Sequence, residues 1–256
     1  MGERLPYTQL VGGSNPSLVI FWFSMFNIKD NLKAIFDSIA EEEIKSNRTP
    51  GSVVLCAVSK TKPYEMISEV VSGQQRVFNI GENYVQEIEK KFKDIKRDYT
   101  LRMIGHLQCN KVNKVVPLVD TIDSVDSLKL LDKINECSIK NGKVTRILIE
   151  LNTAFDGEKT GFMSEDEALQ AIEDIEQKKG VCLSGFMTMG ELGGSEVQLR
   201  RSFGKLREFA EKVKREHPDL NPDVLSMGMS SDWRYAVREG STMVRIGSAI
   251  FGARTQ

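Results

Sequence analysis

The sequence predicts a single-domain (β/α)8 barrel, also called a TIM barrel. After residue 50, short apolar runs alternate with charged segments in which apolar residues recur every three or four positions. Strands that alternate with helices in this way form a parallel sheet. The alternation repeats eight times, and the chain of 256 residues matches the length of about 250 residues that is usual for such a barrel.

Each of the eight units begins with an apolar run that we expect to be a strand. An open, doubly wound sheet is the alternative, but it usually carries a G-x-G-x-x-G turn after its first strand, and here "SKTKPYE" follows that strand. The barrel is therefore preferred. Its expected strands are 53–58, 77–82, 102–107, 121–126, 146–152, 182–189, 224–230 and 243–251.

An additional helix is expected before the first strand. The stretch "MFNIKDNLKAIFDSIAEEEIKS" spaces its apolar residues as an amphipathic helix does, so the barrel domain is expected to cover 26–256. We expect residues 1–25 to be an extension that is poorly ordered or without function. The run "SLVIFWFSMF" is about half of the ~20 residues that a membrane-spanning helix needs. The residues before it also lack the basic start and the cleavage pattern of a secretory signal.

The overall composition argues against several classes of partner. The chain has 35 basic and 36 acidic residues, so no nucleic-acid partner is expected. Its four cysteines form no C-x-x-C pair, which suggests a reducing compartment, without metal or disulfides. We therefore expect a cytoplasmic protein that does not bind a membrane. No extra apolar face is evident, which favours a monomer.

Lys60 is the candidate nucleophile. The active site of a barrel lies at the carboxyl ends of its strands, and Lys60 comes directly after the run "VVLCAVS". Burying an ammonium group costs several kcal/mol unless it is paired or neutralised. Burial that lowers the pKa of such a lysine would make its amine able to condense with a carbonyl compound. The alternative is a lysine whose ammonium reaches solvent.

Two later turns predict a phosphate site that faces Lys60. In "LSMGMSSDWRYAV" a strand is followed by a helix that Ser230 or Ser231 is expected to cap, beside backbone N–H groups. In "VRIGSAIFG", Gly247 permits close backbone approach and Ser248 offers a hydroxyl. Phosphate sites in barrels commonly use the loops after strands seven and eight. A lysine opposite such a site fits a phosphorylated aldehyde, either pyridoxal 5′-phosphate or a sugar phosphate.

Several motifs resemble one known family. The segments "AVSKTKP", "GENYVQE", "IGHLQCNK", "GFMTMG", "LSMGMSSDW" and "VRIGSAIFG" occur in order on nearly every strand. Together they resemble the pyridoxal phosphate homeostasis proteins, single-domain barrels similar to the N-terminal cofactor domain of alanine racemase. The resemblance runs from about residue 28 to residue 254 and includes the strand-five loop "NTAFDGEKTGF", through Glu158, Lys159 and Gly161.

The resemblance implies a role for each matched residue. Lys60 would hold the pyridoxal phosphate covalently, and Arg245 would face the pyridine nitrogen. An arginine at that place keeps the nitrogen unprotonated and so weakens the ring as an electron sink. The phosphate would be held by Ser230, Gly247 and Ser248, and the mouth would be lined by Asn83 and His106.

Some assignments stay open at this stage. His106 either lines the mouth or makes a structural hydrogen bond. Tyr64 stands at a spacing from which racemases send a tyrosine to the phosphate, but packing on a helix face is preferred. The four methionines on the expected strands are interpreted as core residues. They are Met187, Met189, Met227 and Met229.

Three functions fit the sequence. The first is a carrier or buffer of pyridoxal phosphate with little or no turnover, whose partners would include apoenzymes that need this cofactor. The second is an amino-acid racemase, which needs an acid or base on each face of its substrate. In racemases one of these groups comes from a second domain, and the sequence ends at Gln256, directly after strand eight. The carrier is therefore preferred, and a sugar-phosphate aldolase is the third alternative.

Overall fold

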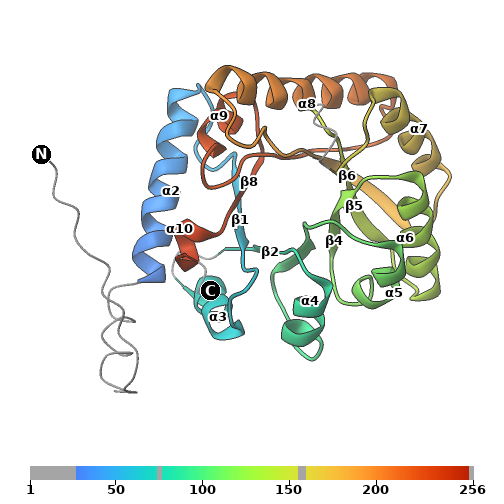
Figure 1. The fold of residues 1–256 in the computed structure, drawn as a ribbon, viewed down its shortest axis with the longest axis horizontal. Helices are drawn as coiled ribbons and strands as arrows, with labels where there is room; N and C mark the ends of the chain where they lie inside the picture. The colour runs from blue at the N-terminus through green and yellow to red at the C-terminus, as the bar shows by residue number, and fades with distance from the viewer. Residues whose placement is uncertain (1–26, 74–76, 155–159, 254–256) are drawn as a thin grey trace, which may run out of the picture.

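The computed structural model describes residues 27–73, 77–154 and 160–253. Within them, eight parallel strands close into a barrel in which sequence neighbours are spatial neighbours and the last strand pairs with the first (Figure 1). The predicted fold class is confirmed. The strands are β1 (Val54–Val58), β2 (Asn79–Glu82), β3 (Thr100–Met103), β4 (Thr121–Val125), β5 (Thr145–Glu150), β6 (Val181–Met187), β7 (Val224–Ser226) and β8 (Met243–Ile246).

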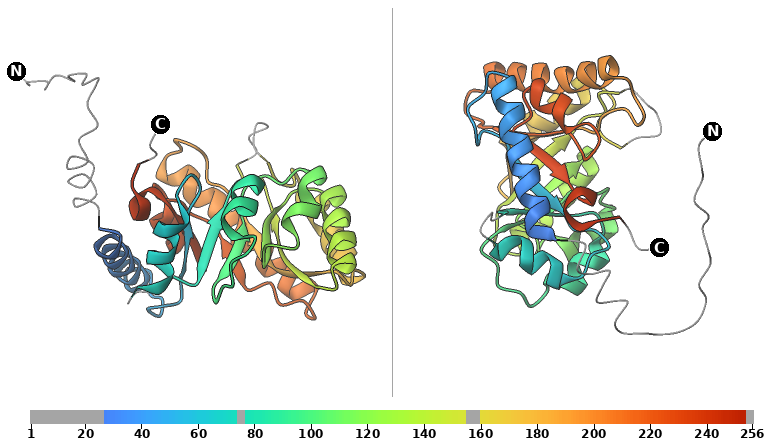
Figure 2. Two further views of the ribbon diagram at one scale, coloured as in Figure 1. Left: turned by 90° about the horizontal axis from the view of Figure 1, so that it is seen from below. Right: turned by 90° about the vertical axis from the view of Figure 1, so that its left-hand side faces the viewer.

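Helices cover the outside of the barrel (Figures 1 and 2). They are α2 (Ile28–Lys45), α3 (Tyr64–Ser72), α4 (Val85–Phe92), the 3₁₀ turn η1 (Cys109–Lys111), α5 (Val112–Val115), α6 (Leu128–Lys140), α7 (Glu165–Glu176), α8 (Glu196–Glu216), α9 (Trp233–Arg238) and α10 (Ser248–Phe251). In the described parts of the chain, no helix combines the length and the apolar character needed to cross a bilayer.

Six of the eight strands, all but β1 and β2, end one to five residues earlier than the sequence predicts. The last was expected to reach residue 251, but it ends at Ile246 because the chain turns at Gly247 into α10. The N–H groups of Ile250 and Phe251 both donate to the carbonyl oxygen of Gly247, at 2.9 Å. Strand β7 ends before Gly228, whose φ of +92° places it in the left-handed region that strands do not use. The early ends of β7 and β8 leave more loop at the mouth of the barrel.

The predicted N-terminal helix is α2. It begins at Ile28 because the side chain of Asn27 accepts hydrogen bonds from the N–H groups of Lys29 and Asp30. Its buried face includes Leu32 and Ile39, and it packs against α3, α9 and α10, as the right-hand view of Figure 2 shows for α9 and α10. The expected extension 1–25 lies outside the described residues.

The barrel interior combines apolar packing with a buried ion pair. One apolar cluster joins side chains from β1, β5, β6 and β8, namely Cys56, Leu148, Met187 and Met243. Because these strands lie on opposite sides of the barrel, their side chains can meet only in its interior. Arg102 on β3 pairs with Asp123 on β4, with 2.9 Å between Nε and Oδ2. The interior is therefore filled, and ligand space is left at its open end.

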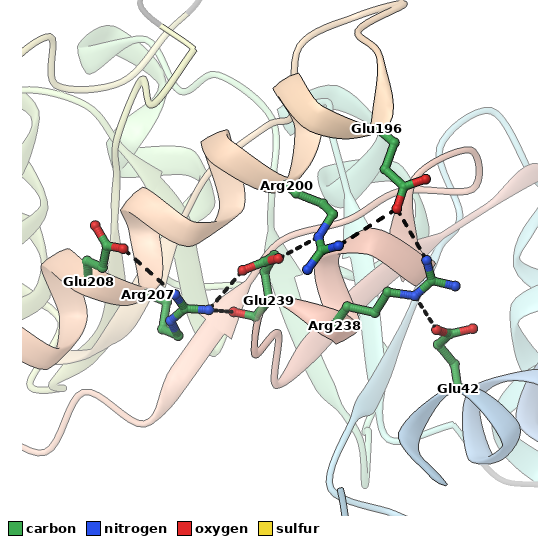
Figure 3. A network of polar contacts seen from close by, with 7 residues as sticks. All are labelled: Glu42, Glu196, Arg200, Arg207, Glu208, Arg238 and Glu239. Carbon is green, nitrogen blue, oxygen red and sulfur yellow. Dashed lines mark hydrogen bonds and ion pairs between the residues drawn. The ribbon is translucent and has the colours of Figure 1, made fainter. Parts of the chain in front are cut away.

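A network of ion pairs links α2 to α8 and to the end of α9 (Figure 3). Arg238 at the end of α9 pairs with Glu42 of α2 at 2.6 Å and with Glu196 of α8 at 3.5 Å. Glu239 pairs with Arg200 at 2.7 Å and with Arg207 at 2.9 Å, and both arginines lie on α8. The side chain of Glu42 is only 4% exposed, and Arg238 is its partner in this network.

Truncating Arg238 is expected to destabilise the fold. In the Arg238→Ala variant the carboxylate of Glu42 loses its partner while the rest of α2 keeps it buried, which should lower the free energy of unfolding by about 1–2 kcal/mol. Urea unfolding measures this loss. Arg201→Ala is the matched control, because Arg201 is exposed on α8. Equal stability of the two variants would show that the ion pairs of Arg238 contribute nothing to stability.

Candidate functional site

A cavity of about 240 Å³ opens at the carboxyl ends of the strands. Besides apolar atoms of Val58, Ile104 and two methionines, its lining holds two lysines, one arginine, one amide and two hydroxyls. Six of the seven predicted site residues therefore meet in one place. They are Lys60, Asn83, Ser230, Arg245, Gly247 and Ser248.

Lys60 lies in the turn that follows β1, two residues beyond Val58. It is half-buried, whereas Ser59 just before it is fully buried. The N–H of Ser59 still donates to the carbonyl oxygen of Gly81 on β2, at 3.0 Å. The backbone is thus fixed to the barrel up to the residue before the lysine, and the lysine side chain lines the cavity.

Arg245 is fixed by the ends of two neighbouring strands. It lies on β8 and is 5% exposed. Its Nη1 donates to the carbonyl oxygen of Ser226 at 2.6 Å and to the hydroxyl of Ser226 at 2.8 Å, and its Nη2 donates to the carbonyl oxygen of Thr188 at 2.9 Å. Burial lowers the pKa of Arg245. These three contacts hold the guanidinium in one orientation at the floor of the cavity.

Two hydroxyls converge from the loops after β7 and β8. The hydroxyl of Ser248 donates to that of Ser230 at 3.4 Å. Gly247 lies against the end of β1, because a Cβ added there would come within 3.0 Å of the carbonyl oxygen of Val58. A side chain at Gly247 would therefore press on the end of β1, the strand that leads to Lys60.

The predicted cap of the following helix is wrong. Neither Ser230 nor Ser231 caps α9, whose N-cap residue is Asp232. The carboxylate of Asp232 turns back and accepts from the N–H of Met229 at 2.5 Å. The left-handed turn at Gly228 starts the loop early, so the helix begins two to three residues beyond the serines. The place of Ser230 in the cavity therefore owes nothing to capping.

Asn83 presents an acceptor that lacks a partner within the described residues. Its Oδ1 is buried there without a hydrogen bond, although buried polar atoms are almost always paired. The backbone of Asn83 packs closely on Gly105, where an added Cβ would lie 2.4 Å from the carbonyl oxygen of Asn83. An unpaired acceptor in a cavity lining fits a ligand that brings a donor.

His106 and Tyr64 are not in this cavity. His106 is 53% exposed, and its Nδ1 lies 3.0 Å from Oδ2 of Asp126 in a separate hollow. The structure thus contains the structural hydrogen bond that was one of the two alternatives for His106. A contact between His106 and a ligand stays a prediction. Tyr64 packs edge-on against Phe92 with 6.0 Å between ring centroids, which confirms the packing interpretation.

The methionines divide into two pairs. Met187 and Met227 are buried in the core, as expected. Met189 and Met229 instead line the cavity, because each lies in the loop just beyond the end of its strand. The expectation for those two is corrected: the strands they were assigned to are shorter than predicted.

Sequence reasoning missed two charged residues. Lys62 lines the cavity beside Lys60, donates to the carbonyl oxygen of Ala253 at 2.9 Å, and has a pKa that burial lowers. Glu150 ends β5, is 2% exposed and accepts from the hydroxyl of Thr160 at 2.7 Å. In the sequence, Lys62 could have been noticed as the second lysine of "KTK", and Glu150 as the single acidic residue at the end of the apolar run "RILIE".

In the strand-five loop, the structure explains the need for a glycine at position 161. Glu158 and Lys159 lie outside the described residues. Gly161 has a φ of +111°, and a Cβ there would lie 2.8 Å from the backbone nitrogen of Asn152. Glycine thus lets the returning chain pair with the end of β5, where the N–H of Phe162 donates to the carbonyl oxygen of Glu150 at 2.8 Å.

The buried carboxyl of Glu150 should make stability depend on pH. Burial raises its pKa, so the folded protein holds this proton to a higher pH than the unfolded chain, and stability falls as the pH rises through the folded pKa. The Glu150→Gln variant keeps the acceptor for Thr160 but does not ionise. Its advantage in urea unfolding over the native protein should be small near pH 4 and grow with pH. A difference that does not change with pH would contradict the burial argument.

Comparisons with known proteins decide the family. The model of the alanine racemase N-terminal domain matches residues 37–255. A pyridoxal phosphate homeostasis protein of Vibrio alginolyticus is 37% identical over 236 residues, which cover 90% of this chain and 99% of that protein. The chain belongs to the pyridoxal phosphate homeostasis protein family. This membership agrees with the resemblance seen in the sequence motifs.

Solved structures support the same family placement. PipY of Synechococcus elongatus, solved with pyridoxal phosphate bound, is 32% identical with a TM-score of 0.71, and the match covers 84% of this chain and all of that one. A protein of Bifidobacterium adolescentis described as unknown is 33% identical with a TM-score of 0.79, over 88% of this chain and 94% of the other. The family barrel is therefore shared along nearly its whole length.

Proposed function

We propose that this member of the pyridoxal phosphate homeostasis family binds pyridoxal phosphate in the cavity, through a Schiff base with Lys60. The observation that carries the proposal is the convergence of an amine, a fixed guanidinium and two hydroxyls in one cavity. The family relative PipY, solved with this cofactor, supports it. The protein then acts as an intracellular carrier or buffer of the cofactor, with little or no turnover.

Four residues of the lining have a task in holding the cofactor. Pyridoxal phosphate supplies an aldehyde, a phosphate, a ring hydroxyl and a ring nitrogen. Lys60 bonds to the aldehyde carbon through its neutral amine, whose two hydrogens leave with the aldehyde oxygen as water. Ser230 and Ser248 donate their hydroxyls to the phosphate. Asn83 accepts through Oδ1, for which the ring hydroxyl is a suitable donor.

Arg245 sets the reactivity of the ring. An arginine stays protonated at physiological pH, so it can donate a hydrogen bond to the ring nitrogen but cannot accept one from a protonated ring nitrogen. The nitrogen then stays unprotonated, and the ring withdraws electrons weakly from a bound group. Because Ser226 and Thr188 already hold the guanidinium, Arg245 is not free to move away. This arrangement favours storage of the cofactor over catalysis.

The lining also argues against racemase activity. A racemase needs a proton donor or acceptor on each face of its substrate. Among the described residues that line the cavity, the ionisable side chains are those of Lys60, Lys62 and Arg245, with no aspartate, glutamate, histidine, tyrosine or cysteine. Lys62 uses a hydrogen to bond Ala253. Apart from Lys62, which lies two residues from Lys60 along the chain, and the guanidinium of Arg245, the described lining therefore offers no second acid or base.

Solvent exchange and cofactor transfer separate the two functions. In deuterium oxide, the loaded protein should leave the α-hydrogen of L-alanine and other amino acids at the background rate, whereas a racemase would exchange it. The loaded protein should also restore activity to an apoenzyme that requires pyridoxal phosphate, faster than an equal amount of protein reduced with borohydride. Rapid α-hydrogen exchange, or no transfer at all, would contradict the carrier function.

A further inference from the structure

The residue after Lys60 has an unfavourable backbone conformation. Thr61 has a φ of +64°, in the left-handed region. A β-branched residue is rarely found there, because its Cβ crowds the following carbonyl group. Such conformations persist only where the surroundings impose them, and they concentrate at functional sites. Something near Thr61 must therefore hold the turn that carries Lys60.

Hydrogen bonds from a neighbouring unit hold both sides of Lys60. On one side, the hydroxyl of Ser59 donates to Oε1 of Glu82 at 2.6 Å. On the other side, the N–H of Thr61 donates to Oε2 of Glu87 at 2.8 Å. Glu82 ends β2 and Glu87 lies in the first turn of α4. The second β/α unit thus holds, through these hydrogen bonds, the loop that follows β1.

A single ammonium group joins these contacts. Nζ of Lys91 donates to Oε1 of Glu82 at 2.8 Å, to Oε2 of Glu87 at 2.5 Å and to the carbonyl oxygen of Ser59 at 3.0 Å. All three of its hydrogens are therefore used, and its side chain is only 10% exposed. Burial raises the pKa of the Glu82 carboxyl, while Lys91 and Ser59 act to lower it. Without Lys91, two carboxylates would face each other beside the turn.

We propose that Lys91, acting through Glu82 and Glu87, is a positioning residue that keeps Thr61 in the left-handed conformation and so directs Lys60 into the cavity. This inference rests on the proposed function, since the direction of Lys60 matters only if its amine holds the cofactor. If Lys91 instead only fastens α4 to the barrel, its loss would change stability and leave the geometry at Lys60 unaltered.

The Lys91→Met variant tests the proposal, with Lys90→Met as its matched control. Lys90 is the adjacent lysine of α4, and its side chain is exposed. In the ligand-free protein, the amide hydrogen of Thr61 should exchange with solvent at least about tenfold faster in Lys91→Met than in the control, because its acceptor is no longer held. With pyridoxal phosphate, the apparent dissociation constant should rise about tenfold, since only the left-handed fraction binds.

A second change distinguishes positioning from general stability. Glycine adopts the left-handed conformation without the cost that threonine has. Adding Thr61→Gly to Lys91→Met should therefore restore part of the affinity, to within about threefold of the native protein. It should also restore the circular dichroism that the bound chromophore acquires when it is held in one orientation. A purely structural role for Lys91 predicts that Thr61→Gly restores neither the affinity nor this signal.

A milder variant covers the case in which Lys91→Met does not fold. Glu87→Ala removes the acceptor of the Thr61 amide at a side chain that is 23% exposed, and it should shift exchange, affinity and circular dichroism in the same direction by about threefold. Values equal to those of Lys90→Met in the folded variants would overturn the proposal. If the native protein and Lys90→Met also bind no cofactor, the proposed function fails, and the exchange rate of the Thr61 amide still decides the positioning of the turn.

Discussion

Replacing Lys60 with alanine is expected to abolish covalent retention of pyridoxal phosphate while the barrel still folds. Lys60 is half-buried in a turn beyond β1, so its loss removes no core packing and should change the free energy of unfolding by less than about 1 kcal/mol. The affinity for the cofactor should fall roughly a hundredfold or more, since about 1.4 kcal/mol of binding free energy corresponds to a factor of ten. Equilibrium dialysis and borohydride labelling measure the two losses.

Lys62→Ala is the control for that experiment. Lys62 lines the same cavity two residues further along the chain, so both variants lose one lysine from the same place. The Lys62→Ala protein should still be labelled at Lys60. A Lys60→Ala protein that keeps a reducible adduct, on Lys62 or elsewhere, would show that another amine holds the cofactor.

Replacing Arg245 with methionine is expected to have the largest effect on stability. Methionine fills a similar volume but removes three hydrogen bonds to buried acceptors, two on Ser226 and one on Thr188. At about 1 kcal/mol for each lost hydrogen bond, the free energy of unfolding should fall by about 3 kcal/mol. The relief of a desolvated charge opposes this loss only in part.

Urea unfolding of the cofactor-free protein measures the effect of Arg245→Met. Arg201→Met, at an exposed position of α8, is the matched control. Unchanged stability of Arg245→Met would mean that its guanidinium does not bridge the ends of β6 and β7. When the variant is folded and loaded, the ring nitrogen should take up a proton more readily, which a pH titration of the chromophore detects.

The alternation of strand and helix was enough to predict the barrel, because each strand must be apolar and each outer helix must have one apolar face. The ends of the strands were harder to predict. The run 249–251 is as apolar as a strand, yet it forms α10 because Gly247 lets the chain turn there. An apolar run in the sequence indicates that the segment is buried, but it does not distinguish a strand from a short buried helix.

The site was predictable where a residue type is rare at a strand end, as with Lys60 and Arg245. It was not predictable where the partner comes from another unit of the barrel. Lys91 reads as an exposed lysine in an amphipathic helix, and only the fold brings it to Glu82 and Ser59. The capping role expected for Ser230 or Ser231 failed for a local reason, because the left-handed turn at Gly228 starts the loop early and α9 begins after Asp232.

The most direct test of Lys60 as the residue that holds the cofactor is an absorbance spectrum of the purified protein before and after borohydride reduction, followed by peptide mass mapping. We expect a visible band from bound pyridoxal phosphate, which disappears on reduction and leaves the mass of the reduced cofactor on the peptide that contains Lys60. A protein that stays colourless and takes no label when pyridoxal phosphate is added would contradict the proposed function and direct the search to sugar phosphates.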